Sequence, residues 1–430
     1  MGELVELEAS PKPGSGRPRL KTVKKGGGGR KGGSKTALVL GGGGFTGGVY
    51  EIGALRALDL LTVNRTVNDF DIYVGTSAGA FVATLVANGI TPDEMSRVVN
   101  KQSSTRFREV DLGTLLKPNY VDFAARSVLM PLRLLGLGRS LASRWREVSV
   151  MDIITGLAEA LPPGVYNPAG IERYIHQVLS EDPQTTDDFK GLEPELFLTA
   201  TDLDTCERVV FGAPGWDDVP ISKAVSASAA LPMVYRPVDV KGRQLIDGGI
   251  RSTTNVDLAV ERGAKFIVVV NPLVPYVNDF QKRIPTIFGS RVRRVSDMGY
   301  PQVGYQAFKL LAHARLHEHV KHWSERYPGV DIILIEPDPN DELMFGTSIM
   351  NYSSRLEIAR HGFESVTLRL AEDYRKYKQI CEKHGIEISA RRVTKILRQV
   401  EEQREKTTAW RRIFEQTTGA LLRQSASAEK

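Results

Sequence analysis

Short apolar runs that end at glycines or polar turns alternate along this chain with stretches whose apolar residues recur at helical spacing. The apolar runs lie at residues 36–40, 70–74, 195–200 and 265–270, and they have the length of buried strands. The first run leads into a helical pattern from Val49 onward, and the second into a run of small residues over 80–88. Strands that are apolar on both faces need helices on both faces, so the pattern predicts an α/β sheet covered on each side.

Three segments depart from this alternation and set the domain limits that we predict. Residues 1–35 are rich in Pro, Gly, Ser, Lys and Arg, the composition of a disordered basic arm, and one domain follows over 36–375. Within it, residues 101–152 interleave Leu with Arg, which fits either a lid lying on lipid or a helix docked on the core. Residues 376–430 form a charged amphipathic helical tail whose apolar side faces a membrane, a partner helix or its own domain.

The basic character of the chain belongs to the arm. The formal net charge is +6, and nine of the 57 Lys and Arg residues and three of the 51 Asp and Glu residues lie in residues 1–35. The remainder carries 48 residues of each sign and is formally neutral. We therefore expect no specific nucleic-acid partner, and we leave open a peripheral contact of the arm with an anionic membrane surface.

Targeting and redox signals are few. The first ten residues alternate Glu with short apolar residues and hold no continuous apolar segment, so we expect no secretory signal peptide. No uninterrupted apolar run reaches the roughly 18 residues of a membrane span. Cys206 and Cys381 are the only cysteines, too few for a disulfide framework. These features predict a cytoplasmic protein.

The first candidate for chemistry is Ser77. The pattern Gly-x-Ser-x-Gly at residues 75–79 lies between an apolar strand and a helix of small residues. A nucleophile elbow needs this context, because the serine sits on a tight strand-to-helix turn and the flanking glycines admit neighbouring backbone. The pattern therefore predicts a nucleophilic serine.

Residues 41–48, of which six are glycines, directly follow the first predicted strand. Successive glycine N–H groups at the start of a helix can converge on the oxyanion of an acyl transfer. A competing interpretation is dinucleotide binding, because Gly42, Gly44 and Gly47 satisfy G-x-G-x-x-G. We disfavour it since it leaves Ser77 without a role.

The third candidate is Asp247, which ends an apolar run and precedes Gly248 and Gly249. A carboxylate delivered on such a turn can approach a serine hydroxyl and accept its proton. Histidine is the more usual partner, but none of the seven lies in a glycine-rich loop after a strand. They are His176, His313, His317, His319, His322, His361 and His384. His313 and His317 share a helical face without the Glu of H-E-x-x-H, so we expect no metal site there.

Taken in order, the glycine run, the serine elbow and the Asp-Gly-Gly turn resemble the three signature blocks of patatin-like phospholipases. Residues 226–232, Ser-Ala-Ser-Ala-Ala-Leu-Pro, resemble a further block of that family, and the match covers roughly residues 36–270. The resemblance implies a three-layer α/β/α sandwich with a mostly parallel central sheet, here with a helical insertion and C-terminal helices. It also implies hydrolysis of lipid carboxylic esters, with a lipid substrate and no cofactor.

The family uses a Ser-Asp dyad, which would explain the absence of a catalytic histidine. By position, the resemblance implies that Ser77 attacks the ester and that Asp247 takes its proton and later activates water. It assigns the oxyanion hole to the amides of Gly42, Gly43 and Gly44. The remaining motif glycines are Gly47, Gly75, Gly79, Gly248 and Gly249.

One residue departs from the family pattern, and two other functions remain open. Thr46 stands where members commonly carry Arg or Lys, which bears on headgroup preference. One alternative is a non-catalytic adaptor of the same fold that binds a membrane or a partner protein. The other is an α/β-hydrolase esterase in which Asp247 and either His313 or His361 complete a Ser-Asp-His triad.

Overall fold

The computed structural model describes residues 34–100, 117–120, 162–278, 284–285, 291–339, 341, 343–344, 353–399 and 402. Most of the predicted basic arm, most of the insertion at 101–152 and the end of the tail therefore lie outside the described residues. Among the described helices, none combines the length and the hydropathy that crossing a bilayer requires.

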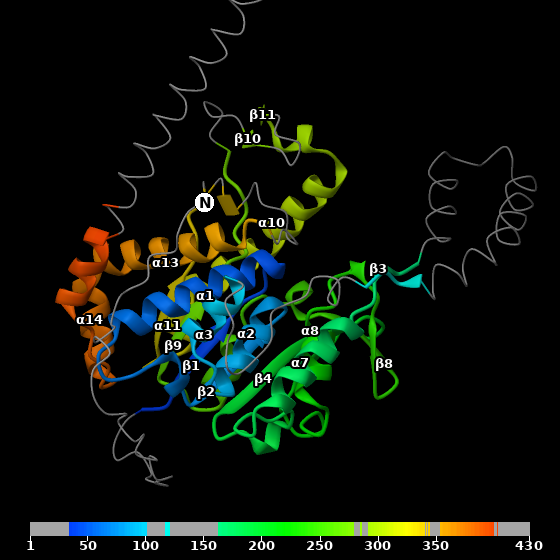
Figure 1. The fold of residues 1–430 in the computed structure, drawn as a ribbon, viewed down its shortest axis with the longest axis horizontal. Coiled ribbons are helices and arrows are strands. Elements are labelled where there is room, and N and C mark those ends of the chain that lie inside the picture. The colour runs from blue at the N-terminus through cyan, green and yellow to red at the C-terminus, as the bar shows by residue number, and fades with distance from the viewer. Residues whose placement is uncertain are drawn as a thin grey trace, which may run out of the picture. The chain divides into compact units, whose positions relative to one another are not determined.

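The described strands form one large sheet and two small ribbons (Figure 1). The large sheet has the order β12 (Asp331–Ile335), β9 (Phe266–Val270), β1 (Thr36–Leu40), β2 (Ile72–Thr76), β4 (Glu195–Asp202), β8 (Arg243–Asp247) and β7 (Val238–Val240), and β5 (Arg208–Phe211) also pairs with β4. The first five strands in this order are parallel, and β5, β7 and β8 join antiparallel. The ribbons are β3 (Gly164–Tyr166) with β6 (Met233–Tyr235), and β10 (Ile284–Pro285) with β11 (Arg291–Val292).

Helices cover both faces of the large sheet, because alternate residues of each inner strand point to opposite sides. Leu38 and Leu40 of β1 join one apolar cluster, and Ala37 and Val39 join another. The first cluster lies against α1 (Gly44–Leu61), α2 (Ala78–Ala87), α3 (Pro92–Val99), α7 (Ala169–Glu181), α8 (Ile221–Ser228), α13 (Arg355–Glu372) and α14 (Tyr374–Lys383). The second lies against α9 (Val256–Glu261) and α11 (Trp323–Arg326). The predicted α/β/α sandwich with a mostly parallel sheet is confirmed.

Two element boundaries differ from the prediction. β2 covers residues 72–76 instead of 70–74, because Phe70 caps a short 3-10 turn, η1 (Val67–Asp69), and the strand continues into the elbow. α1 begins at Gly44, inside the glycine run, and not at Val49. Glycine is tolerated there because neighbouring groups approach closely: a Cβ at Gly47 would lie 3.0 Å from Cγ of Pro272.

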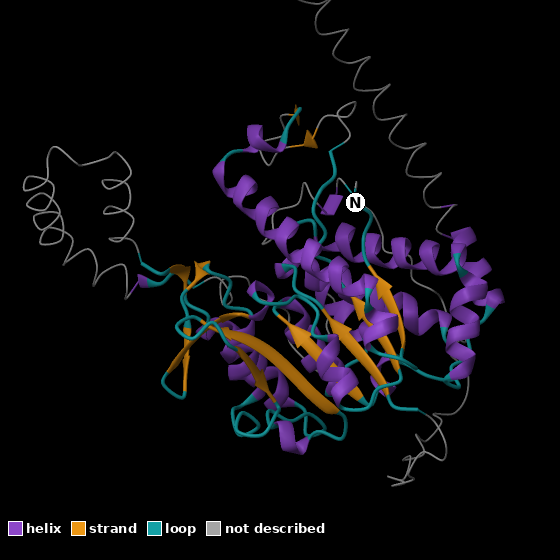
Figure 2. Ribbon diagram, turned by 180° about the vertical axis from the view of Figure 1, so that it is seen from behind, coloured by secondary structure: helices purple, strands orange, loops and turns teal. Residues whose placement is uncertain are grey.

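Helix α13 lies beside α1, although some 300 residues separate them in sequence (Figures 1 and 2). Glycines make this close approach feasible on both sides. A Cβ at Gly53 of α1 would lie 2.1 Å from the carbonyl oxygen of Ala359, and one at Gly362 of α13 would lie 2.4 Å from that of Tyr50. Any side chain at either position would push the two helices apart.

The described part of the tail packs on the rest of the domain. Cys381 of α14 is buried in the main cluster, and Ile388 pairs with Thr62 at the end of α1. Val393 and Ile396, in a helical stretch over residues 390–399, pack against Leu61. The sequence left three partners open for the tail, and these residues contact one of them, the rest of the same domain. The composition of the chain changes near residue 375, but packing continues across that point.

Candidate active site

Strand β4 brings Ser77 and Asp247 together. Its residues 198–201 pair with β5 along one edge, and on the opposite edge β2 and β8 meet end to end. Thr199 pairs with Thr76, and the next residue, Ala200, pairs with Asp247. The ends of β2 and β8 therefore lie at neighbouring positions along one edge of β4. This arrangement brings Ser77 and Asp247 together although they are 170 positions apart in sequence.

Ser77 forms the turn between β2 and α2 in a backbone conformation that is rare for a residue with a side chain. Its φ is 57° and its ψ is −120°. Strain of this kind persists only where surrounding contacts impose it. The Ser77 N–H donates to Oγ of Ser228 at 2.9 Å, and the N–H of Gly79 donates to the Gly41 carbonyl at 3.0 Å. A Cβ at Gly79 would lie 2.4 Å from the Leu40 carbonyl oxygen, so only glycine permits this contact.

The two predicted catalytic side chains are in direct contact. Oγ of Ser77 donates to Oδ2 of Asp247 at 2.5 Å, and both residues are buried. The other carboxylate oxygen, Oδ1, accepts the Gly249 N–H at 2.7 Å, which fixes the orientation of the carboxylate. A hydrogen bond of this length leaves no room for an imidazole between the two groups.

The histidines considered for a triad lie elsewhere. The ring of His313 packs at a tilt against that of His317, and Nε2 of His361 pairs with Asp341. Neither histidine lines the cavity at Ser77. The Ser-Asp-His alternative is therefore incompatible with the described geometry.

Burial controls the protonation of Asp247. Removal from water raises the pKa of its carboxyl from 3.8 to about 6, and the hydrogen bonds from Ser77 and Gly249 offset part of that rise. The group is therefore ionised at neutral pH but is more basic than an exposed aspartate. A carboxylate of this kind is a better proton acceptor near its operating pH.

The glycine run lies against the serine. A Cβ at Gly42 would lie 3.3 Å from Cβ of Ser77 and 3.9 Å from its Oγ, so the backbone of Gly42 packs directly against the serine. Gly42, Gly43 and Gly44 all line the cavity that contains Ser77. Because α1 starts at Gly44, the positive end of the helix dipole lies at this part of the cavity.

A cavity of about 1080 Å³, partly open to solvent, surrounds the dyad. Apart from the dyad and the glycines, its walls are almost entirely apolar. The apolar side chains come from α1, α2, α3, α7, the β6 region, the loop after β9 and α10 (Tyr300–Lys321). They are Phe45, Val49, Ile52, Phe81, Val82, Val99, Ile171, Leu231, Val234, Leu273 and Phe308. The site therefore combines a reactive polar pair with a large apolar volume.

The remaining motif glycines allow neighbouring backbone to pack closely around the dyad. A Cβ at Gly75 would lie 2.6 Å from Cα of Ala80, and one at Gly248 would lie 2.4 Å from the Thr199 carbonyl oxygen. Gly249 lines the cavity and Gly47 packs on Pro272. Thr46 is buried in α1 and is not among the cavity-lining residues.

Four buried polar residues support the site, and the sequence pattern assigned none of them a role: Thr76, Thr199, Ser228 and Asn255. Ser228 accepts from the Ser77 N–H and donates to the Thr199 carbonyl at 2.7 Å. Hydroxyls of Thr76 and Thr199 meet at 2.9 Å beneath the elbow, and Nδ2 of Asn255 donates to both. The block at residues 226–232 was the available signal for Ser228, but spacing alone does not reveal which of its serines faces the elbow.

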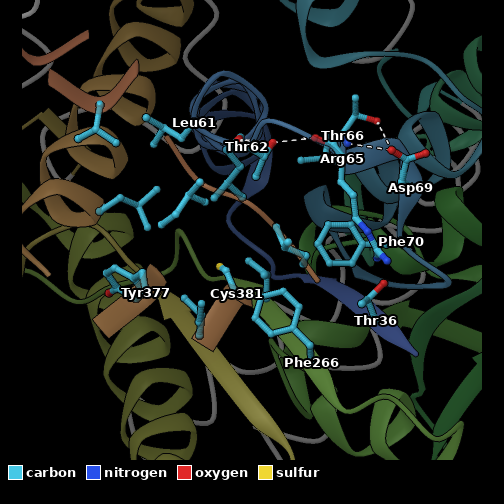
Figure 3. A pocket seen from close by; sticks show the side chains of 18 of the residues that line it. Thr36, Leu61, Thr62, Arg65, Thr66, Asp69, Phe70, Phe266, Tyr377 and Cys381 are labelled. Carbon is cyan, nitrogen blue, oxygen red and sulfur yellow. Dashed lines mark hydrogen bonds between the residues drawn. The ribbon is translucent and has the colours of Figure 1, made fainter. Parts of the chain in front are cut away.

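A second cavity, of about 770 Å³, lies at the opposite end of the strands, between the sheet and α1, α13 and α14 (Figure 3). Its walls include Phe266, Tyr377 and Cys381, and the polar groups at its rim bond to one another, as Thr66 does with Asp69. In open α/β sheets ligands bind at the carboxyl ends of the strands, where Ser77 lies. We therefore place no chemistry in this second cavity.

The chain belongs to the patatin-like phospholipase family: the model of that family matches residues 38–260, more than half of the sequence. A curated relative is an uncharacterised protein of Acanthamoeba polyphaga mimivirus, 24% identical over 205 residues. That alignment covers 47% of this chain and 55% of the relative, so the chain spans about half the length of the relative it matches.

Solved structures with a similar fold include VipD from Legionella pneumophila, at 15% identity and a TM-score of 0.36, covering 82% of this chain and 67% of that one. The type III effector ExoU of Pseudomonas aeruginosa matches at 16% identity and a TM-score of 0.34, covering 79% of this chain and 53% of that one. Human GIVD cytosolic phospholipase A2 in complex with methyl gamma-linolenyl fluorophosphonate matches at 12% identity and a TM-score of 0.28, covering 80% and 58%.

Proposed function

We propose that this protein is a lipid acyl hydrolase that cleaves carboxylic esters of phospholipids, lysophospholipids or acylglycerols through an acyl-enzyme on Ser77. The observation that carries the proposal is the 2.5 Å contact between Oγ of Ser77 and Oδ2 of Asp247, inside an apolar cavity of about 1080 Å³. Membership in the patatin-like phospholipase family supports a lipid ester as the substrate.

The dyad performs the reaction in two halves. Oγ of Ser77 attacks the ester carbonyl carbon while its proton passes to Oδ2 of Asp247, and a tetrahedral oxyanion forms. Collapse breaks the bond to the leaving alcohol, which takes the proton from Asp247. Water then attacks the acyl-enzyme with the same carboxylate as base, and the fatty acid leaves with Ser77 restored.

Backbone donors stabilise the charge that develops on the carbonyl oxygen. The amides of Gly42, Gly43 and Gly44 border the cavity beside Ser77, at the positive end of α1. Donors preorganised in an apolar site stabilise an oxyanion more than water does, and removal of one such donor typically costs about 100- to 1000-fold in rate.

The walls of the cavity suit an acyl chain. Phe81 and Val82 of α2 and Phe308 of α10 line it, and among the residues that the structure describes Asp247 is the one charged side chain in its walls. A flexible apolar chain gains free energy by leaving water for such a volume, about 0.8 kcal/mol for each buried methylene. The headgroup therefore remains at the open end, and we infer that the protein meets its substrate at a lipid surface.

The test is ester hydrolysis by the purified chain. We expect release of fatty acid from a panel of lysophospholipids, phospholipids and diacylglycerols, and loss of that activity in both Ser77→Ala and Asp247→Asn. Matched controls are Ser96→Ala on α3 and Asp239→Asn on β7, which lie outside the cavity and are expected to keep the wild-type rate. Equal activity in Ser77→Ala and the wild type would contradict the proposal.

A further inference from the structure

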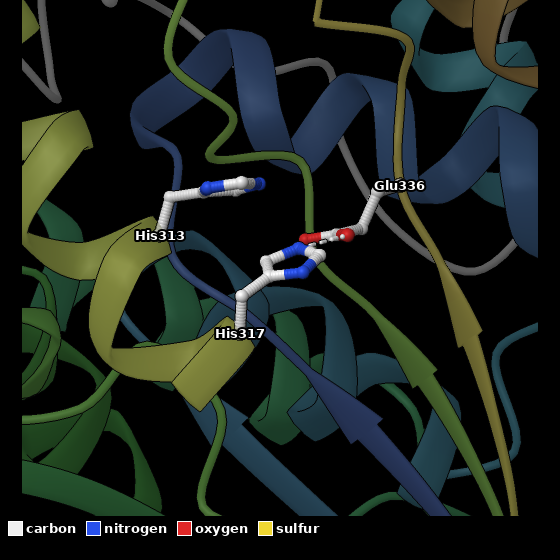
Figure 4. Close-up of side chains that lie close together, drawn as sticks. All are labelled: His313, His317 and Glu336. Carbon is white, nitrogen blue, oxygen red and sulfur yellow. Dashed lines mark hydrogen bonds and ion pairs between the residues drawn. The ribbon is translucent and has the colours of Figure 1, made fainter. Parts of the chain in front are cut away.

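Three potential metal ligands lie together at the carboxyl edge of the sheet: His313 and His317 of α10, and Glu336 just after β12 (Figure 4). Glu336 directly follows β12, and Asn271 directly follows the neighbouring β9. The two histidines are four residues apart on α10 and therefore project from the same face of the helix. Helix α10 and β12 are thus connected by three side chains, each of which is a common metal ligand.

The spacing of these groups is close to that of a metal site. Nε2 of His317 lies 2.9 Å from Oε2 of Glu336, the imidazole centroids of His313 and His317 are 4.0 Å apart, and one ligand atom from each residue lies within 4.8 Å of the others. Ligand atoms of a tetrahedral Zn²⁺ ion with bonds of about 2.05 Å lie about 3.3 Å apart. Side-chain shifts of about 1.5 Å or less bring all three atoms to that spacing.

The carboxylate is held in a way that leaves one oxygen for a ligand. Nδ2 of the fully buried Asn271 donates to Oε1 of Glu336 at 2.7 Å, so that Oε2 faces the histidines. Outer hydrogen bonds of this kind orient the ligating carboxylates of metal sites. An ordinary ion pair would need only His317 and Glu336 and would not account for His313 beside them. Within the described part of the chain, neither ring nitrogen of His313 has a hydrogen-bond partner, so both are available to a ligand.

We propose that His313, His317 and Glu336 bind a divalent first-row transition metal ion, with Zn²⁺ as the ion that the two imidazoles and one carboxylate fit best. The donor set leaves a fourth position for water. Calcium and magnesium are disfavoured because they select oxygen ligands. The sequence predicted no metal here because the helix lacks the Glu of H-E-x-x-H, whereas this carboxylate follows a strand and lies 19 residues beyond His317.

A metal at this position would fix α10 against the sheet. The same helix contributes Phe308 to the cavity at Ser77, and Asn271 lies next to the glycine run, since a Cβ at Gly41 would be 3.0 Å from its Oδ1. The ion would therefore hold one wall of the cavity in place without touching the ester. Its presence does not depend on the proposed hydrolysis.

The experiment is a zinc titration of the untagged, chelator-treated chain in competition with a chromophoric chelator. We expect one tight site in the wild type, weakened about 100-fold or more in His313→Ala, His317→Ala and Glu336→Gln, and unchanged in His319→Ala. His319 is the matched control because it lies on the same helix, is exposed and is not part of the cluster. Calcium and magnesium should not displace zinc.

Two further readouts separate metal binding from a folding defect. Zinc should raise the Tm of the wild type and of His319→Ala but not of His313→Ala. The His313 side chain makes no hydrogen bond within the described residues, so its removal is not expected to disturb the fold by itself. Zinc should also slow amide hydrogen exchange along α10. Equal affinity in the wild type and His313→Ala, or equal loss in His319→Ala, would overturn the proposal, and neither result bears on ester hydrolysis.

Discussion

Replacing Asp247 by Asn should make the protein more stable while it removes the proposed base. The carboxyl is buried, and its pKa is raised to about 6 from 3.8. A group with a raised folded-state pKa stabilises the fold fully below its unfolded pKa, and that stability is lost as the pH rises through the folded pKa. Asparagine has the same shape and carries no charge to bury.

The size of the effect follows from the pKa difference. A rise from 3.8 to about 6 is about 2.2 units, and each unit corresponds to 1.36 kcal/mol, so the wild type loses about 3 kcal/mol between pH 4 and pH 7. Asp247→Asn should match the wild type near pH 4 and should exceed it by up to about 3 kcal/mol at pH 8.

Urea unfolding of both proteins at pH 4 to 8 measures this difference as a shift of the transition midpoint. Asp239→Asn, at an exposed position on β7, controls for the loss of a carboxylate. A difference that stays constant across this pH range, or an Asn variant that is the less stable protein at pH 8, would refute the burial argument. The same pKa predicts that kcat/KM of the wild type rises with pH and levels off above about pH 6.

Three further substitutions test the surroundings of the dyad. Gly42→Ala places a Cβ 3.3 Å from Cβ of Ser77, so the serine or the glycine run must shift, and kcat should fall about 10-fold or more, whereas Gly304→Ala, in an open part of α10, should leave it unchanged. Ser228→Ala leaves the buried N–H of Ser77 without its acceptor, so the free energy of unfolding in urea should fall by about 1–3 kcal/mol and the hydrolysis rate should also fall. A variant with unchanged stability and activity would show that this hydrogen bond does not hold the elbow. Glu51 is fully buried in α1, and burial raises the pKa of its carboxyl well above the usual value, while the Gly41 backbone offsets part of that rise. Glu51→Gln should therefore gain stability over the wild type by about 1.4 kcal/mol per pH unit from pH 4.5 up to the raised pKa of Glu51, and a gain that does not vary with pH would contradict this.

The sequence predicts the layers of the fold and the three loops that meet at Ser77, because both depend on local pattern. An apolar run of five residues identifies β1, and Gly-x-Ser-x-Gly between a strand and a helix identifies the elbow. The contact of Ser77 with Asp247 requires more, since it depends on β2 and β8 sharing one edge of β4. Strand order of this kind is not encoded by local spacing.

The same reason explains what the sequence did not reveal. Ser228 supports the elbow from a helix 151 positions away, and Glu336 reaches His317 from the end of a strand. The start of α1 at Gly44 was misplaced because helix propensity counts against glycine, whereas here close packing on Pro272 overrides that preference. Each of these features depends on tertiary contacts between segments distant in sequence.

The central claim is that Ser77, activated by Asp247, is the nucleophile of an ester hydrolase. The most direct measurement is mass spectrometry of the intact and digested chain after reaction with an alkyl fluorophosphonate, which reports the modified residue and the stoichiometry. We expect one adduct on Ser77 in the wild type, strongly slowed labelling in Asp247→Asn and none in Ser77→Ala. A wild-type chain that stays unlabelled, or that carries its adduct on another serine, would contradict the account and favour a non-catalytic role.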